Sequence, residues 1–135
     1  MDDEVKAISP SEAREGVGQN NPASPDDAAL LIYTTFPTLD DAKKTGRFLV
    51  ENRLAACINI LPQIITIYEW EGKLQDDGET AMLVKTTTGR KVQVLDEIKR
   101  LHPYSVPARL VLPIAGGGTD FLAWIAAQCA PREPA

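Results

Sequence analysis

The feature that most constrains this fold is a run of strand-favouring residues that is long for the chain around it. The run from Cys57 to Trp70 is rich in isoleucine and is interrupted by Pro62. At about 3.3 Å per residue it would span roughly 45 Å, whereas a domain of about 100 residues has a radius of gyration near 13 Å. Either Pro62 bends the run into two shorter strands, or the strand projects beyond its own domain. We favour projection, which would leave Tyr68 and Trp70 to be covered by another subunit.

The remaining pattern alternates strands and helices. Thr38 to Asp41 resembles a capping box, with Asp in place of the usual Glu or Gln, and the residue before Pro103 should end the second helix. The expected order is a strand at 29–35, a helix from 38, a strand at 56–70, a polar turn at 72–78, a strand at 80–86, a helix at 89–101, a strand at 109–114 and a helix capped by Thr119. This predicts an α+β, ferredoxin-like βαββαβ fold with a C-terminal helix, in which both crossover helices cover one face of an antiparallel sheet.

The net charge lies in the N-terminal segment. Residues 1–28 carry seven acidic and two basic side chains and so account for the whole net charge of −5. They have no aromatic residue and several prolines and glycines, which predicts a disordered acidic extension. Residues 29–130 then form one domain and 131–135 a frayed C-terminus. A neutral domain argues against a nucleic-acid partner, and no apolar run is long enough to span a membrane. The acidic start favours a cytoplasmic location over secretion.

Five motifs, in order and spacing, resemble the CutA family of divalent-cation tolerance proteins. The resemblance implies a ferredoxin-like protomer in a homotrimer. Bacterial members are associated with tolerance to divalent metals, copper above all, and animal members with anchoring of acetylcholinesterase. The trimer is also similar to the PII signalling proteins, which bind small ligands between subunits. The motifs are Leu54 to Ile60, Tyr68 to Lys73, Glu79 with Leu83 to Thr86, His102 to Pro107, and Leu112 to Ile114.

The resemblance also implies a metal site that this sequence keeps only in part. In copper-binding bacterial members the ligands include a cysteine at the end of the first strand and two adjacent histidines before Pro-Tyr. Those positions fall on Thr34, Leu101 and His102, so only His102 remains. Ala108 stands where the family usually has glutamate after Val-Pro.

Two residues are candidate metal ligands. His102 has an imidazole suited to Cu(II) or another divalent cation, but it also fits a structural role at a helix C-terminus. Cys57 would supply a soft thiolate, but its small apolar neighbours favour a buried, inert side chain. Both alternatives remain open for each residue.

A second set of residues could line a pocket between subunits. Lys85 interrupts an apolar strand and needs a partner, because an unpaired buried charge is costly. An internal salt bridge with interface packing is the alternative interpretation. The candidates are Tyr68, Trp70, Glu79, Lys85 and Tyr104. The glycines at 116–118 are expected to form a flexible turn, since a phosphate-binding motif is incomplete there.

These observations favour a binding protein over an enzyme. Ser105 is the only serine near His102, and no third residue completes a triad. We expect a homotrimer that binds divalent cations, copper in particular, and acts in the response to metal ions. The alternative is a PII-like regulatory or scaffold trimer that binds a small ligand or a protein between its subunits, without metal.

Overall fold

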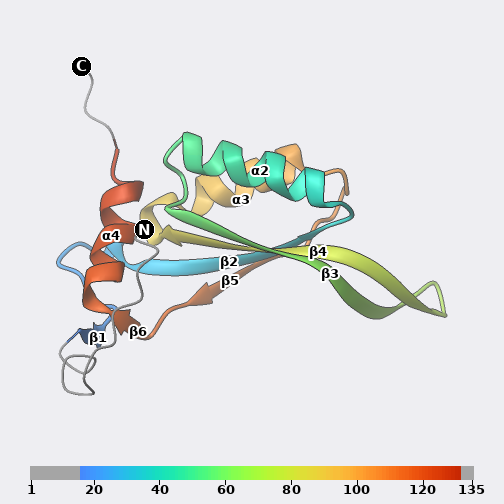
Figure 1. Cartoon of the computed structure of the whole chain (residues 1–135), viewed down its shortest axis with the longest axis horizontal. Coiled ribbons are helices and arrows are strands. Elements are labelled where there is room, and N and C mark those ends of the chain that lie inside the picture. The colour runs from blue at the N-terminus through green and yellow to red at the C-terminus, as the bar shows by residue number, and fades with distance from the viewer. Residues whose placement is uncertain (1–15, 132–135) are drawn as a thin grey trace.

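The computed structural model describes residues 16–131, and the expectations for 1–15 and 132–135 lie outside this range. A four-stranded antiparallel sheet has the order β3-β4-β2-β5, and α2 and α3 cover one of its faces (Figure 1). The α+β, ferredoxin-like fold is therefore confirmed. The elements of this layer are β2 (Ala29–Phe36), α2 (Leu39–Glu51), β3 (Cys57–Trp70), β4 (Lys73–Thr87), η2 (Thr88–Arg90), α3 (Lys91–Leu101) and β5 (Arg109–Pro113).

The core lies between the sheet and these two helices. Along β2 the buried and partly exposed positions alternate, as the period of a strand requires. In α2 the buried positions recur at helical spacing, so that one stripe faces the sheet. The largest fully buried apolar side chains of this core are Phe36, Ile32, Leu49, Met82, Ile98, Val84 and Val94, whereas the buried Ile125 belongs to a second cluster with Ala29, Ala56 and Cys129.

Thr38 caps α2 as predicted, but the Asp41 carboxylate binds the Thr38 hydroxyl and not the Thr38 backbone amide that a full capping box would use. The Asp41 amide donates to Thr38 Oγ1 at 3.1 Å, and the Thr38 hydroxyl donates to the Asp41 carboxylate at 2.8 Å. At the other end of the helix, Asn52 Nδ2 donates to the Phe48 carbonyl at 2.8 Å. The Asp41 amide thereby gains an acceptor that the helix backbone does not provide, whereas the Phe48 carbonyl also accepts from the Asn52 backbone amide at 3.1 Å.

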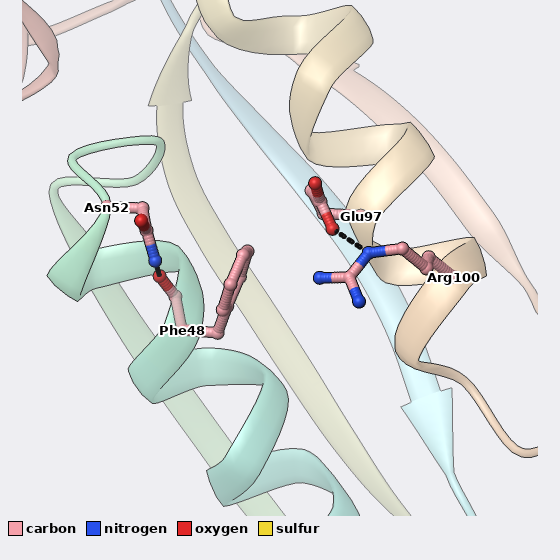
Figure 2. A network of polar contacts seen from close by, with 4 residues as sticks. All are labelled: Phe48, Asn52, Glu97 and Arg100. Carbon is pink, nitrogen blue, oxygen red and sulfur yellow. Dashed lines mark hydrogen bonds and ion pairs between the residues drawn. The ribbon is translucent and has the colours of Figure 1, made fainter.

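The two helices meet through an aromatic and charged contact (Figure 2). The Arg100 guanidinium of α3 lies 5.2 Å from the centre of the Phe48 ring of α2, and its Nε is 2.5 Å from the Glu97 carboxylate. The guanidinium therefore bridges the two helices on their exposed side, between the Glu97 carboxylate and the Phe48 ring.

The β3–β4 hairpin projects beyond the helices (Figure 1). Pro62 does not fold it back, because an irregularity between Leu61 and Ile64 inserts one extra residue into β3, and Gln63 there has φ of 60°. The predicted polar turn at 72–78 is wrong. The turn is centred on Glu71 and Gly72, and β4 begins at Lys73.

The other face of the sheet is apolar and uncovered by α2 and α3. We call it the open face. Strand register sets the neighbours across it: Leu31 pairs with Lys85 and Leu112, and Tyr33 pairs with Leu83 and Leu110. Leu110 is 60% exposed in the single chain. An exposed apolar face of this kind marks an interaction site.

Residues 16–28, which we predicted to be disordered, contain two short elements. They are β1 (Val17–Gln19) and η1 (Pro25–Asp27), and β1 pairs with β6 (Gly116–Gly118). The predicted flexible glycine turn is therefore a strand. The last helix, α4 (Thr119–Cys129), lies at one end of the sheet, and Thr119 is its first residue, with Gly118 at the capping position.

Candidate functional site

His102 ends α3 and is 8% exposed. Its Nε2 lies 2.6 Å from the Thr35 carbonyl, and its Nδ1 accepts from the Tyr104 amide at 3.0 Å. Because a carbonyl only accepts, Nε2 must carry the proton in this arrangement. The ring also stacks on Phe36, with 4.5 Å between centroids. Both ring nitrogens are thus engaged within the chain, and a metal ion would have to displace one of these partners.

The other family ligand positions offer little to a metal ion. Thr34 is fully buried, and its Oγ1 has no hydrogen-bond partner among the described residues. Its register partner on β5 is Arg109, a cation that donates to the Leu95 carbonyl at 2.9 Å. Between residues 16 and 131 no group of three or more His, Cys, Asp or Glu side chains is placed to hold a metal. A complete copper site therefore does not fit within one described chain.

Cys57 lies at the start of β3, opposite Lys85. The Lys85 ammonium is 3.9 Å from Cys57 Sγ and 5.3 Å from the centre of the Phe121 ring of α4. His102 instead hydrogen-bonds to the Thr35 carbonyl of β2. Thr35 lies four residues from Leu31, and Leu31 is the residue of β2 that pairs with Lys85. The two candidate metal ligands are therefore not brought together within one chain.

Tyr68 and Tyr104 lie in the field of the same carboxylates, which belong to β4 of the hairpin. The Tyr68 hydroxyl donates to Asp77 at 2.7 Å, and this hydrogen bond is the main cause that raises the pKa of Tyr68. Burial chiefly raises the pKa of Tyr104, and the charges of Glu79 and Asp77 raise it further. The structure thus places Tyr68, Glu79 and Tyr104 in one neighbourhood.

The other two pocket candidates lie elsewhere. Trp70 is 64% exposed at the tip of the hairpin, and Lys85 lies on the open face near α4. The five candidates therefore form one pocket only if different subunits supply them. Asp77 is the residue that the sequence analysis missed, because it fell within the predicted turn. The sequence carries no clear signal for it, because residues 75–79 are all polar or glycine and show no alternation of apolar and polar side chains.

One groove on the described surface contains none of these candidates. It measures about 440 Å³ and lies along the outer side of α2, beside the end of α3. Most of the residues that line the groove are charged. Among these lining residues, Leu101 occupies one of the positions that hold metal ligands in the family. The residues are Asp40, Lys43, Lys44, Arg47, Phe48, Glu51 and Leu101.

Fold and surface together define a ferredoxin-like α+β protein with a projecting hairpin and an uncovered sheet face. The sequence model of the CutA1 divalent ion tolerance protein family matches residues 30–128. The chain belongs to this family.

Named relatives and solved structures support this assignment. The "Divalent-cation tolerance protein CutA" of Pectobacterium atrosepticum is 41% identical over 100 residues, which cover 74% of this chain and 91% of that protein. The human "Protein CutA" is 40% identical over 93 residues, or 69% of this chain and 52% of that protein. The crystal structure of CutA1 from Ehrlichia chaffeensis aligns with a TM-score of 0.74 at 33% identity, covering 76% of this chain and 96% of that one.

Proposed function

We propose that this protein acts as a homotrimer in the cell's response to divalent cations, copper among them. The observation that carries the proposal is the combination of a projecting hairpin with an open apolar face. Ile65, Trp70 and Leu74 of the hairpin are 71%, 64% and 78% exposed in the single chain. A second copy would bury these side chains and the open face, and would remove two unpaired strand edges at the same time.

The role in cation response rests on the relatives. Two bacterial relatives, each more than 40% identical, are named divalent-cation tolerance proteins. Because one described chain lacks a complete donor set, we propose that any metal site is assembled between subunits. His102 and Cys57 are its proposed ligands, with donors from a neighbouring chain. The relatives' names describe tolerance and no reaction, and we propose a binding role without catalysis.

Calorimetric titration of the full chain with Cu(II) tests the metal proposal. We expect His102→Ala to weaken binding at least tenfold, an effect of about 1.4 kcal/mol. Binding should be weaker at about pH 5.5 than at about pH 7.5, because protons compete with metal for a ligating imidazole. A variant with Asp2→Asn, Asp3→Asn and Glu4→Gln controls for loose binding by the acidic N-terminus. Equal affinity with alanine at position 102 would assign His102 a purely structural role.

A second candidate function is the binding of a small ligand or protein between subunits. It is favoured by Lys85, which interrupts the apolar open face and has no carboxylate within ion-pair distance among the described residues. Within a trimer this ammonium would need an anionic partner. If the variant with Asp2→Asn, Asp3→Asn and Glu4→Gln binds no metal ion, the regulatory function replaces the proposed metal-binding function.

We also propose a cytoplasmic location, since Cys57 and Cys129 are both free thiols. A solved relative from Archaeoglobus fulgidus is described as periplasmic, so cell fractionation is the deciding test. Within residues 16–131 no helix is both long and apolar enough to cross a membrane.

A further inference from the structure

Residues 16–28 precede the range that the family model matches, yet they contact three separate parts of the fold. Val17, Gly18 and Gln19 of β1 pair with the three glycines of β6. The Gly16 carbonyl accepts from the amide of Thr119, the first residue of α4. Segment 16–28 is therefore attached to the start of the last helix.

The Asn20 side chain attaches the same segment to the sheet. Its Nδ2 donates to the carbonyls of Ala29 (2.8 Å) and Ile114 (2.9 Å), and its Oδ1 accepts from the Ala29 amide at 3.0 Å. These are the contacts that a neighbouring strand would make with β2. One amide side chain thus joins the start of β2 to Ile114, which directly follows β5.

A third attachment lies at the end of the segment. The Thr88 amide of η2 donates to the Ala28 carbonyl at 2.9 Å, and Gly89 lies directly against Asp26. A Cβ at Gly89 would lie 3.2 Å from the Asp26 carbonyl oxygen. Segment 16–28 is consequently fixed at both of its ends and in the middle.

The glycines of β6 are explained by this attachment. A Cβ at Gly116 would lie 2.4 Å from the Gly18 carbonyl oxygen, a separation that real side chains do not reach. At Gly117 the nearest atom to such a Cβ is in the Leu122 side chain, at 3.9 Å, an ordinary contact. Close approach of β1 therefore requires glycine at 116 and not at 117.

The two ends of α4 are attached by different parts of the chain. At its C-terminus, Arg53 Nη2 donates to the Ala127 carbonyl (3.0 Å) and Arg90 Nε to the Cys129 carbonyl (2.9 Å). These guanidinium groups satisfy the last carbonyls of the helix. The hydrogen bond from α4 to segment 16–28 lies at its first turn, which includes Phe121.

We propose that residues 16–28 form a strap that closes the first turns of α4 onto the end of the sheet. The strap thereby sets the position of Phe121 beside Lys85, the charged residue of the open face. When the strap opens, the N-terminal half of α4 detaches, while the C-terminal half stays attached at Arg53 and Arg90. This inference concerns one chain and stands apart from the trimer and metal proposals.

Hydrogen exchange of the full chain, followed by mass spectrometry, tests the strap with a matched pair of glycine variants. In Gly116→Ala the added methyl group prevents the pairing of β1 with β6. We expect exchange at residues 118–123 to rise by on the order of tenfold or more. Exchange at residues 127–130 and in α2 should stay unchanged. Gly117→Ala is the control and should match the unmodified protein throughout.

A second pair of variants, Asn20→Ala and its control Asn21→Ala, tests the strap if Gly116→Ala does not fold. Asn20→Ala removes three hydrogen bonds of the strap, whereas Asn21→Ala alters an exposed neighbour that contacts Gln19 through its backbone amide. Asn20→Ala should speed exchange at 118–123 and Asn21→Ala should not. Unchanged exchange in Asn20→Ala would overturn the strap. So would a rise of equal size in α2, α3 and residues 127–130, because it would report loss of the whole fold.

Discussion

At the scale of single residues, Thr38 shows how one side chain determines where a helix begins. We expect Thr38→Ala to lower the free energy of unfolding by about 1 kcal/mol, because the Asp41 amide loses its acceptor. Thr38→Ser keeps the hydroxyl and should stay within a few tenths of a kcal/mol of the parent protein. Urea denaturation at a single protein concentration measures both. Equal losses in the two variants would contradict the capping role.

The raised pKa of the Tyr68 hydroxyl leads to a prediction about stability at high pH. Because its pKa is raised above the ordinary 10.0, the folded chain holds this proton more tightly than the unfolded chain does. The resulting stabilisation is present below pH 10.0 and is lost as the pH rises through the raised pKa. Asp77→Asn should lower the pKa of Tyr68 towards its ordinary value, since the nearby negative charge is removed.

Absorbance titration of the phenols, with Tyr68→Phe to assign the signal, measures this pKa. Asp76→Asn is the matched control, because the register places Asp76 on the opposite side of the hairpin from Asp77. An equal shift in both variants would show that overall charge, and not the hydrogen bond from Tyr68, is responsible.

Some residue roles could be predicted from sequence and others could not. The cap at Thr38 was predictable because it depends on residues within one helical turn. The partners of His102 were not, because Thr35 lies on a strand far away in the sequence. Arg53 is similar: its φ of 57° is costly for a side chain other than glycine, and only the tertiary structure shows that its guanidinium binds α4.

At the scale of elements, the hairpin was predicted in part. The length of β3 and its pairing with β4 followed from the strand-favouring residues. The turn was misplaced, since residues 73–78 are polar or glycine except for Leu74, and this polarity was taken for a loop. A hairpin beyond the core can be polar on its surface and still be a strand. The pairing of β1 with β6 was missed because three consecutive glycines carry no hydrophobic pattern.

The position of Trp70 on this hairpin leads to a prediction about how tightly the proposed oligomer assembles. We expect Trp70→Ala to raise the dissociation constant of the oligomer at least tenfold, and Trp124→Ala to raise it less. Trp70 is 64% exposed at the tip, whereas Trp124 is 36% exposed and stacks on Phe121 of its own helix. Sedimentation at several protein concentrations compares the two. A larger effect of Trp124→Ala would count against a hairpin covered by a partner.

At the scale of the whole molecule, the sequence predicted the layer arrangement and the family, since both depend on the order of elements and on motifs. It misjudged residues 16–28, because their contacts lie with residues near 89 and 116 and leave no local pattern. The proposed assembly of subunits is a property of several chains, and the open face of one chain is the feature that motivates it. We propose that this face is buried in a homotrimer.

The molar mass in solution tests this proposal. It is measured by light scattering as the protein elutes from a gel-filtration column at micromolar concentration. We predict a mass three times the 14.7 kDa of one chain. Leu110→Glu places a charge on the open face and should yield single chains. Val92→Glu is the matched control, since Val92 is 64% exposed on α3 and Leu110 is 60% exposed on β5. It should remain a trimer. A single-chain mass for the unmodified protein, or a trimer that survives Leu110→Glu, would show that the open face is not buried in a homotrimer.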